Sequence, residues 1–428
     1  MEFEYIPFAR PHVGKEEEEA VLRVLRSGWL TTGMEALTFE KEFAAFLDGP
    51  EAKSADSTRA PGLPPLQALA VNSATSGLHL ALEACGTGPG DLVLLPSYTF
   101  TATAEAARYL GAEPVFVDVS PDSFHMDPAA LEKTLSRLDA GLPAYPQRGG
   151  RGPRGKVSAV VPVHYGGLPC DMKRIMEIAQ GRGFRVIEDA AHSFPSRIPG
   201  APAETGTAPL DAFAGTLGDA GVFSFYATKT ITTGEGGMVV SRDQTLAKRI
   251  SIMRSHGIDR AVWNRYTDKK ASWYYEVVEA GFKYNIPDIL AALGRVQLKK
   301  ALFLLKKRED IARRYDEAFG GDGRFFLPPT GTGDARHLYP LRLNMEELSL
   351  TREDFIEKLQ EQGIGVSVHF IPLHIMPYYQ RRYALEAEDF PESVKSFTGV
   401  ISLPIWPGME EKQVERVIRA VKKTADMG

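Results

Sequence analysis

The stretch from Gly218 to Ser241, GDAGVFSFYATKTITTGEGGMVVS, limits the possible folds of this chain more than any other. Apolar residues at 221–225 and 237–240 predict two short buried strands. The turn between them is rich in hydroxyl groups and glycines and has Lys229 at its centre. Burial disfavours a charged amine, so it lowers the pKa of a lysine and frees the neutral amine to attack carbonyl groups. A lysine in a loop is also compatible with an ordinary surface position, and this stretch alone does not decide between the two.

A carboxylate upstream changes the interpretation of this lysine. The sequence RVIEDAAH, at residues 185–192, predicts an apolar strand that ends at Asp189. A buried carboxylate needs a cationic partner, because an unpaired buried charge is very costly. In enzymes that use pyridoxal phosphate, that partner is the protonated ring nitrogen of the cofactor, and a lysine binds the cofactor aldehyde. Asp189 and Lys229 are therefore the two kinds of side chain that such an enzyme needs.

Strand and helix patterns alternate through most of the chain and predict an α/β fold. Residues 66–84, LQALAVNSATSGLHLALEA, fit a strand, a small-residue turn and a helix. Residues 91–119 fit a compact strand, helix and strand unit, which implies parallel pairing with a right-handed crossover. A ligand crevice in such a sheet lies outside the carboxyl ends of the strands.

Two candidate cofactor contacts directly follow strands of this pattern. Thr75 and Ser76 fall at the start of a predicted helix, where unpaired N–H groups and the helix dipole favour a phosphate. The same residue types are also ordinary N-caps. Phe100 follows the next strand, where its ring could stack on a cofactor or pack in the core.

Composition excludes several functional classes. The net charge of −5, from 50 basic and 55 acidic residues, argues against a general nucleic-acid or membrane-surface binder. The two cysteines form no CxxC pair, which suits a reducing compartment. The start of the chain lacks the pattern of a signal peptide, and no apolar run approaches the length of a membrane span, so we expect a cytoplasmic protein. No cluster with metal-ligand spacing accompanies the histidines, and we expect no metal site.

The chain resembles the DegT/DnrJ/EryC1/StrS family of pyridoxal phosphate-dependent sugar-nucleotide aminotransferases. The likeness rests on blocks in order along nearly the whole chain: SGWLTTG, NSATSGLHLAL, LPSYTFTATAEA, VDVSPDSFHMD, EDAAH, FSFYATKTITTGEGG, GFKYNIPDILAALGRVQL, GIGVSVHFIPLH and SLPIWPGM. The resemblance implies the aspartate-aminotransferase fold (fold type I), with a mainly parallel seven-stranded sheet and a smaller α+β C-terminal domain. The expected divisions are 1–35 for an N-terminal arm and helix, 36–305 for the large domain and 306–428 for the small domain.

The resemblance also assigns roles to individual residues. Lys229 is the lysine that binds the cofactor and moves protons, and Asp189 is the partner of the ring nitrogen. The remaining cofactor contacts that it implies are Ala74, Thr75, Ser76, Phe100, His192, Ser224 and Asn285. Asn285 matches a family asparagine that reaches the phosphate of the neighbouring subunit's cofactor, so we expect a homodimer with shared active sites.

Residues 369–383, HFIPLHIMPYYQRRY, look most like the corresponding segment of transaminases that act on UDP-linked 4-keto sugars, including the 4-amino-4-deoxyarabinose enzyme. By this resemblance the amino donor is glutamate and the acceptor is a nucleotide-linked keto sugar, for amino-sugar, polysaccharide or lipid-sugar biosynthesis. The candidate substrate contacts are Trp29, His369, His374 and Tyr378. Each of them is also compatible with core packing or a surface position.

Two alternative functions belong to the same fold. A sugar dehydratase of this family carries histidine in place of the lysine, so Lys229 argues against it. A non-catalytic regulatory protein of this type carries an additional helix-turn-helix domain, and no such segment fits here. Three segments, at 50–65, 141–156 and 196–216, are predicted as loops, and the last two are longer than the family usually carries.

Overall fold

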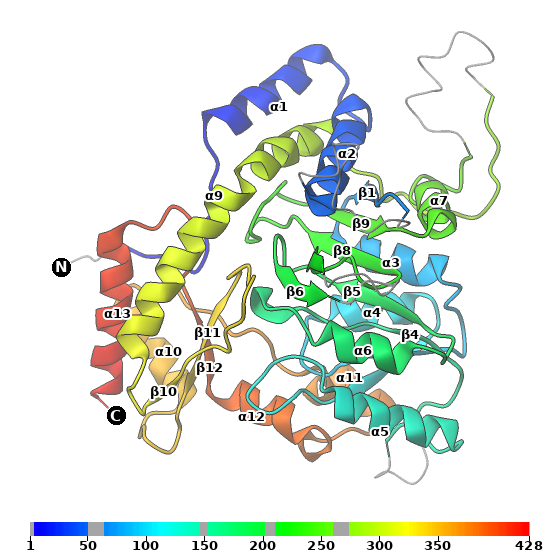
Figure 1. Ribbon diagram of the computed structural model, residues 1–428. Helices are drawn as coiled ribbons and strands as arrows, with labels where there is room; N and C mark the ends of the chain where they lie inside the picture. Colours follow the sequence, from blue (N-terminus) through cyan, green and yellow to red (C-terminus); the bar gives the residue numbers. More distant parts are fainter. Residues whose placement is uncertain (1–3, 50–63, 146–151, 202–209, 260–273, 428) are drawn as a thin grey trace.

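The computed structural model describes residues 4–49, 64–145, 152–201, 210–259 and 274–427. Within these ranges the central sheet has seven strands in the order β1-β9-β8-β5-β4-β2-β3 (Figure 1). The strands are β1 (Gln67–Val71), β2 (Leu92–Pro96), β3 (Glu113–Val117), β4 (Val157–Val160), β5 (Arg185–Asp189), β8 (Ala220–Ser224) and β9 (Gly237–Ser241). Neighbouring strands are parallel, except that β9 runs antiparallel to both β1 and β8. The predicted α/β fold with a mainly parallel sheet is confirmed.

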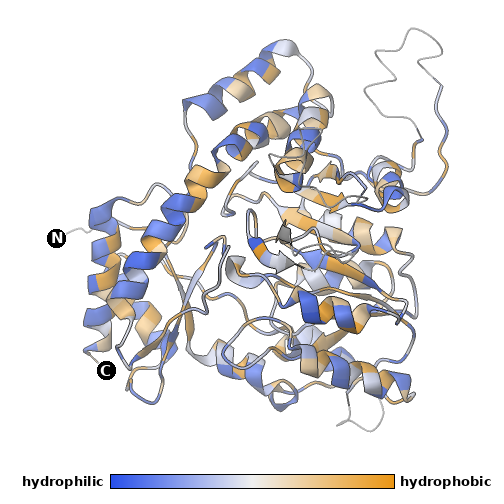
Figure 2. Cartoon of the chain, viewed as in Figure 1, coloured by the Kyte–Doolittle hydropathy of each residue, from blue (hydrophilic) through white to orange (hydrophobic). Residues whose placement is uncertain are grey.

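Helices cover both faces of this sheet where β1, β8 and β9 lie. The large-domain helices are α2 (Met34–Asp48), α3 (Ala74–Ala84), α4 (Ala102–Tyr109), α5 (Pro128–Asp139), α6 (Met172–Ala179) and α7 (Gln244–Met253). Alternate strand residues enter different cores: Val222 and Val239 pack with α3 and α7, whereas Phe223 and Met238 pack with Phe39 of α2. Strands buried on both faces are mostly apolar, and Figure 2 shows orange on several strands of the central sheet, whereas the surrounding helices carry both orange and blue.

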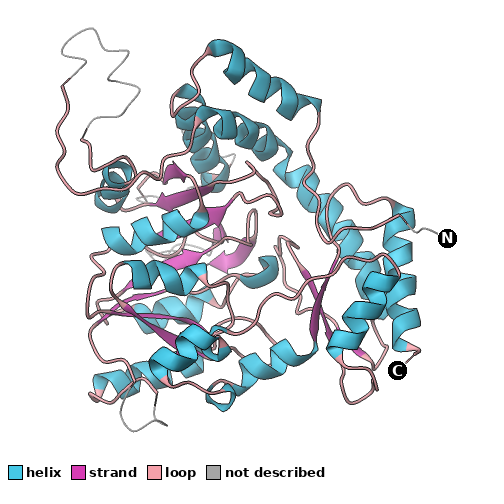
Figure 3. Ribbon diagram, turned by 180° about the vertical axis from the view of Figure 1, so that it is seen from behind, coloured by secondary structure: helices cyan, strands magenta, loops and turns pink. Residues whose placement is uncertain are grey.

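A second, smaller core lies beside a three-stranded antiparallel sheet, which Figure 3 shows apart from the central sheet. Its strands are β10 (Phe325–Phe326), β11 (Tyr339–Leu343) and β12 (Val400–Leu403), and its helices are α10 (Arg352–Glu361) and α13 (Glu411–Ala425). The chain also forms α11 (Pro377–Tyr383), α12 (Pro391–Gly399) and short 3-10 helices η2 (Tyr165–Gly167), η3 (Leu373–Ile375) and η4 (Ala387–Asp389). Tyr379 and Tyr383 of α11 pack in the core of the large domain, so the C-terminal part of the chain contributes to both cores.

The helix α9 (Asp288–Phe319) connects the two cores over 32 residues (Figure 1). Leu298 and Leu304, in its first part, pack against the central sheet, whereas Tyr315 and Phe319 belong to the smaller core. The helix therefore continues without interruption through residue 305, the predicted limit of the large domain. Among the described residues, none of the helices combines the length and apolarity of a membrane span.

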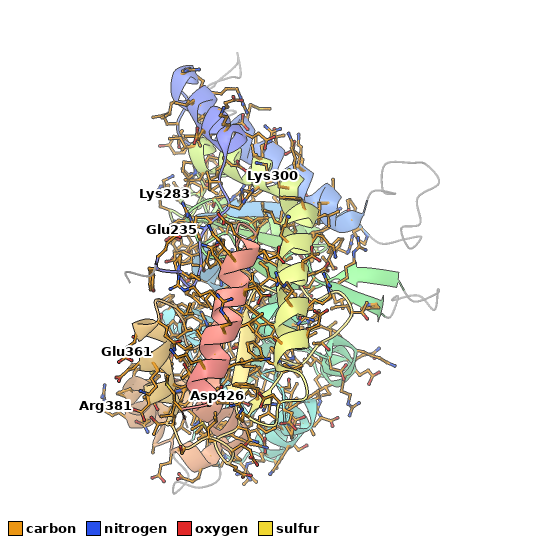
Figure 4. All side chains as sticks on the ribbon, turned by 90° about the vertical axis from the view of Figure 1, so that its left-hand side faces the viewer. Glu235, Lys283, Lys300, Glu361, Arg381 and Asp426 are labelled. Atoms are coloured by element: carbon orange, nitrogen blue, oxygen red, sulfur yellow. The ribbon has the colours of Figure 1, made fainter. Side chains whose placement is uncertain are left out.

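The N-terminal helix α1 (Lys15–Ser27) packs along α9 and corrects one expectation from the sequence. The run of glutamates in KEEEEAVLRVLRS is typical of a solvated helix face, but Glu17 is only 1% exposed. The Glu17 carboxylate lies 2.9 Å from Lys300 Nζ and accepts a hydrogen bond from Gln297 Nε2, both on α9 (Figure 4 labels Lys300). The spacing of polar and apolar residues along α1 indicates which side of the helix is polar. It does not indicate that Lys300 of α9 lies against that side.

The segment 196–216 corrects a second expectation. It was predicted as a loop, but it contains an antiparallel hairpin of β6 (Arg197–Ala201) and β7 (Leu210–Phe213). The Arg197 guanidinium lies over the ring of Phe213 at 4.3 Å, and Phe213 is buried, so the hairpin has an anchored base. Of the other predicted loops, residues 50–63 and 146–151 lie outside the described residues.

The first residue of α9 supports the start of α2, and this contact yields a stability prediction. Asp288 accepts backbone hydrogen bonds from Gly33 (2.7 Å), Ala36 (3.0 Å) and Glu35 (3.2 Å). We expect Asp288→Ala to lower the free energy of unfolding by about 3 kcal/mol, because it leaves several N–H groups without partners. Chemical denaturation of both proteins measures the difference. Asp171→Ala, which removes a single exposed N-cap bond from α6, is the matched control and is expected to cost about 1 kcal/mol; equal losses in the two variants would contradict the prediction.

Candidate active site

The carboxyl ends of β1, β2, β5 and β8 meet at one edge of the central sheet and open into a cavity of about 460 Å³. This edge is where open parallel sheets bind ligands. Phe8 of the N-terminal arm and residues 337–338 and 369–370 of the C-terminal part complete the wall. The predicted site residues that line the cavity are Ala74, Thr75, Phe100, Asp189, His192, Ser224, Lys229 and His369. The fold thus brings together residues that are far apart in the sequence.

The turn that carries Lys229 is fixed by its own hydroxyl groups. Thr232 Oγ1 donates a hydrogen bond to the Phe225 carbonyl at 3.0 Å, and Thr230 Oγ1 donates to the Phe194 carbonyl at 2.5 Å. Both threonines are buried, so their bonds are protected from water. The polar character of this turn in the sequence therefore has a structural cause: the hydroxyls replace the strand hydrogen bonds that the turn cannot make.

The surroundings of Lys229 favour its neutral form. Burial lowers the pKa of Lys229 from its ordinary value to about 8, while the charge of Asp189 acts in the opposite direction. At pH 7, about a tenth of the molecules would hold the neutral amine, a far larger fraction than for a lysine in water. The sequence prediction of a desolvated, reactive lysine agrees with this environment.

Asp189 ends β5 and is 5% exposed at the cavity wall. Its Oδ2 accepts a hydrogen bond from Thr103 Oγ1 at 2.8 Å, and its Oδ1 accepts one from the Ala191 N–H at 3.2 Å. Burial raises the pKa of Asp189, whereas these two bonds and the charge of Lys229 lower it. A buried carboxylate held in this way fits a cationic ring nitrogen in the cavity.

The N-terminus of α3 presents backbone donors to the cavity that suit a phosphate group. Ala74 and Thr75 are the first residues of this helix and line the cavity, and their N–H groups have no acceptor within the helix. Ser73 caps the helix by accepting a hydrogen bond from the Ser76 N–H at 3.1 Å. A Cβ atom on Gly237 would lie 2.8 Å from the Ala74 nitrogen, so a glycine is needed for β9 to pass this close.

Ser76 does not line the cavity, although the sequence placed it with the phosphate contacts. Its hydroxyl donates to Asn72 Oδ1 and to the Ser73 carbonyl, both at 2.7 Å, and the side chain is buried. Ser224, at the end of β8, does line the cavity.

Phe100 and His192 lie on the cavity wall. Phe100 is 57% exposed, so it is not packed in the core, the alternative that the sequence left open. The ring of Phe370 lies between them, with centroid distances of 5.7 Å to each. His192 Nδ1 accepts a hydrogen bond from the Gly166 N–H at 3.2 Å, which places the proton of the neutral ring on Nε2. Burial lowers the pKa of His192 well below its ordinary value.

Several other predicted site residues lie outside this cavity. Asn285 Nδ2 donates to Thr32 Oγ1 at 2.5 Å, and Trp29 Nε1 donates to the Thr32 carbonyl at 3.3 Å. His374 is fully buried, with its ring 4.6 Å from that of Phe390. Tyr378 is exposed on α11. These four residues therefore do not join Lys229 within one chain.

The cavity is also lined by residues that the sequence did not predict, among them Phe8, Thr103, His337 and Phe370. A signal existed for Thr103, because the segment TFTATAEA after β2 is unusually rich in hydroxyl groups. For His337 and Phe8, which approach from distant parts of the chain, the sequence gives no local signal.

The profile of the DegT/DnrJ/EryC1/StrS aminotransferase family matches residues 11–422. The chain belongs to this family. It is 40% identical over 422 residues to the spore coat polysaccharide biosynthesis protein SpsC of Bacillus subtilis, covering 98% of this chain and 96% of SpsC. The putative sugar aminotransferase Spr1654 of Streptococcus pneumoniae, in its PLP form, superposes with a TM-score of 0.80 at 27% identity, covering 99% of each chain.

A further similar structure is Helicobacter pylori PseC, an aminotransferase involved in the biosynthesis of pseudoaminic acid. It superposes with a TM-score of 0.80 at 27% identity and covers 99% of this chain and 100% of PseC. This member of the DegT/DnrJ/EryC1/StrS family is therefore a pyridoxal phosphate-dependent aminotransferase of fold type I, and the similar structures include proteins named as sugar aminotransferases. The prediction of the family, the enzyme class and the cofactor from the sequence is confirmed.

The lowered pKa of Lys229 predicts the pH dependence of cofactor attachment. The neutral amine is the reactive form, so attachment of pyridoxal phosphate to apo-enzyme should accelerate about tenfold per pH unit below pH 8 and level off above it. Rapid mixing with detection of cofactor absorbance measures this rate. Because the charge of Asp189 raises the pKa of Lys229, Asp189→Asn should move the midpoint to lower pH. A midpoint near 10, the ordinary range of lysine, would contradict this environment for Lys229.

Proposed function

We propose that this enzyme transfers an amino group from glutamate to a nucleotide-linked keto sugar, specifically a UDP-linked 4-keto sugar. The observation that carries the proposal is the position of the segment HFIPLHIMPYYQRRY, which resembles that of UDP-4-keto sugar transaminases. Its first two residues, His369 and Phe370, line the same cavity as Lys229. The relatives support a role in sugar biosynthesis, since SpsC is named for spore coat polysaccharide and PseC for pseudoaminic acid.

Lys229 and Asp189 perform the chemical work in this proposal. Bound pyridoxal phosphate supplies an electrophilic aldehyde and an electron sink for the reacting carbon. Lys229 would hold the cofactor through its Nζ, and the freed amine would then remove the proton from the substrate carbon as a base and return a proton as an acid. The Asp189 carboxylate would keep the ring nitrogen protonated, and the hydrogen bond from Thr103 holds that carboxylate in place.

The other lining residues position the reactants. The N–H groups of Ala74 and Thr75 and the hydroxyl of Ser224 would bind the cofactor phosphate at the start of α3. Phe100 and His192, which line the cavity on separate segments, would contact the cofactor ring. His369 and Phe370 line the cavity on the side of the C-terminal part, where the sugar would bind.

The decisive experiment supplies glutamate and a panel of keto sugars linked to UDP, dTDP, GDP or CMP, with products identified by mass spectrometry. We expect an amino sugar to form from a UDP-linked 4-keto substrate, with 2-oxoglutarate as the co-product. A deoxy sugar product without nitrogen would instead indicate the dehydratase alternative. Turnover of only the dTDP-, GDP- or CMP-linked sugars would overturn the nucleotide assignment while leaving the transamination intact.

We further propose that two subunits share each active site, with Asn285 contributed by the neighbouring subunit. Within one chain Asn285 does not line the cavity, yet it matches the family asparagine that contacts a cofactor phosphate in trans. Asn285 forms an antiparallel bridge with Val71, the last residue of β1. This bridge holds the segment around Asn285 at the edge of the sheet where α3 begins.

Mixed dimers provide the test of shared sites. Lys229→Ala and Asn285→Asp should each be inactive, the second because its charge repels the phosphate. A heterodimer of the two variants should recover one intact site of two, hence about half of the wild-type activity per dimer. The matched control pairs Lys229→Ala with Asp189→Asn, whose defects lie in the same half-site and should not complement. Recovery in neither mixture, with heterodimers proven, would argue that each chain builds its own site.

A further inference from the structure

His337 lines the active-site cavity but has no role in the mechanism described above. It lies two residues before β11 and is 5% exposed. Its ring centroid is 4.5 Å from that of His192, and the planes are inclined by 56°. A buried polar side chain that reaches the cavity from the C-terminal part of the chain is well placed to contact what enters beside the cofactor.

The backbone of His337 is held on one side by a buried cation. Arg308 Nη1 donates hydrogen bonds to the His337 carbonyl at 3.2 Å and to the Ile405 carbonyl at 2.9 Å. Burial lowers the pKa of Arg308 to about 10, so the guanidinium remains charged at neutral pH. No carboxylate of the described residues forms an ion pair with Arg308. Burying the Arg308 guanidinium without a carboxylate partner costs folding free energy. Its hydrogen bond fixes the position of the His337 carbonyl.

The β6–β7 hairpin holds the same loop from the other side. The Arg197 N–H donates to the Gly333 carbonyl at 2.8 Å, and Ser196 Oγ accepts from the Ala335 N–H at 3.2 Å. Gly333 has a φ of +81°, and a Cβ there would lie 2.5 Å from the Arg197 carbonyl oxygen. The loop 333–337 is therefore tightly fitted to the hairpin, and the His337 ring has a defined position before any ligand binds.

The ring of His337 has unused hydrogen-bonding capacity. Its Nδ1 is buried and has no hydrogen-bond partner among the described residues. Burial lowers the pKa of His337 well below its ordinary value, and the positive charges of Lys229 and Arg308 act in the same direction. The ring is therefore neutral at physiological pH and offers one N–H donor and one nitrogen acceptor.

The cavity residues around His337 are neutral, and this limits the kind of ligand that they can bind. His192 and His369 also have lowered pKa values because of burial, and the Phe370 ring lies beside them. Neutral imidazoles and an aromatic ring match the hydroxyl and carbonyl oxygens of a sugar, whereas a carboxylate of the amino donor would favour a cation. This side of the cavity thus has the chemistry for the sugar rather than for glutamate.

We propose that His337 is a substrate-contacting residue that hydrogen-bonds an oxygen of the sugar acceptor and thereby contributes to its selection. This inference rests on the proposed keto-sugar aminotransferase function and deepens it. Its distinctive consequence is that His337 acts in only one of the two half-reactions, because glutamate and the sugar occupy the enzyme in turn.

The test measures the two half-reactions separately on holoenzyme by rapid-mixing absorbance. The pyridoxal form is mixed with glutamate, and the pyridoxamine form with the UDP-linked 4-keto sugar. His337→Leu removes the polar atoms at similar volume, and we expect it to lower kcat/KM for the sugar about tenfold to a hundredfold. The rate with glutamate should change less than twofold. Calorimetric titration of the UDP-linked 4-amino sugar product onto the pyridoxal form should show a similar loss of affinity.

Two conservative variants separate recognition from packing. His337→Asn keeps a polar atom near Nδ1 and His337→Gln keeps one near Nε2, so one of them should restore at least a third of the lost sugar half-reaction. Equal slowing of both half-reactions, or no rescue by either variant, would assign His337 a structural role and overturn the proposal. The wild-type enzyme is measured first. If it reacts with glutamate but not with the UDP-linked sugar, the proposed substrate is wrong, and this result is distinct from any effect of the His337 variants.

Discussion

Replacing Lys229 with alanine is expected to reduce transamination by at least about 10⁴-fold, the largest effect of any single change in this enzyme. The substitution removes both the group that binds the cofactor aldehyde and the base that moves the substrate proton. The turn itself should survive, because Thr230 and Thr232 fix its backbone without the lysine side chain. The variant should therefore remain folded and retain non-covalent cofactor.

Borohydride reduction followed by peptide mass spectrometry provides a direct readout of this role. In wild-type enzyme the reduced cofactor should appear on the peptide that contains Lys229, and in Lys229→Ala on no peptide. Lys248→Ala, which changes an exposed lysine on α7, is the matched control and should leave both labelling and activity unchanged. A labelled peptide from another part of the chain would refute the assignment of Lys229.

The central sheet and its reactive pair were predictable because their signals are local. Apolar runs that end in a polar turn locate β8 and β9 around Lys229, and the same pattern ends β5 at Asp189. Since the carboxyl ends of parallel strands share one edge, two such residues on neighbouring strands must approach each other. Local patterns located the two residues in the sequence, the resemblance to the family supplied their expected roles, and the structure adds that β5 and β8 are neighbours.

The features that escaped prediction depend on contacts between distant segments. Glu17 appears solvated on its own helix and becomes buried only because Lys300 and Gln297 of α9 face it. His337 follows Lys229 by more than a hundred positions, and its approach depends on Arg308 and on the hairpin at 197–213. Neither contact leaves a periodic pattern in the sequence, because each needs only one residue from each segment.

These two kinds of residue also divide the chemistry of the cavity. Lys229 and Asp189 lie in or directly after strands of the central sheet and form an oppositely charged pair, whereas His337, His369 and Phe370 come from the C-terminal part and are neutral. The charged pair Lys229 and Asp189 suits the chemistry of the cofactor, which does not depend on the sugar. The neutral residues His337, His369 and Phe370 come from another part of the chain, so substitutions there can change sugar recognition without changing the charged pair.

Asp189→Asn is expected to have the second-largest effect, a fall in kcat of about 10²- to 10⁴-fold with cofactor still bound. Asparagine keeps the shape and can accept the bond from Thr103, but it carries no negative charge to hold a proton on the ring nitrogen. Asp189 is 5% exposed, so water cannot substitute for the missing charge. Turnover at saturating substrates measures the effect, and cofactor absorbance verifies occupancy.

Thr103→Val is the matched control for Asp189, because it removes the hydrogen bond but leaves the charge. The bond from Thr103 lowers the pKa of Asp189, so its loss should raise that pKa further. A carboxylate with a raised pKa loses its charge at a higher pH, and the acidic limb of the kcat profile should therefore move to higher pH in Thr103→Val, with about a tenfold or smaller loss at its optimum. Asp189→Asn has no carboxylate at this position to titrate, so its activity should be low at every pH. If Asp189→Asn instead turned over within twofold of wild type, the ring nitrogen would not need a negative partner, and the buried carboxylate at the end of β5 would serve packing alone.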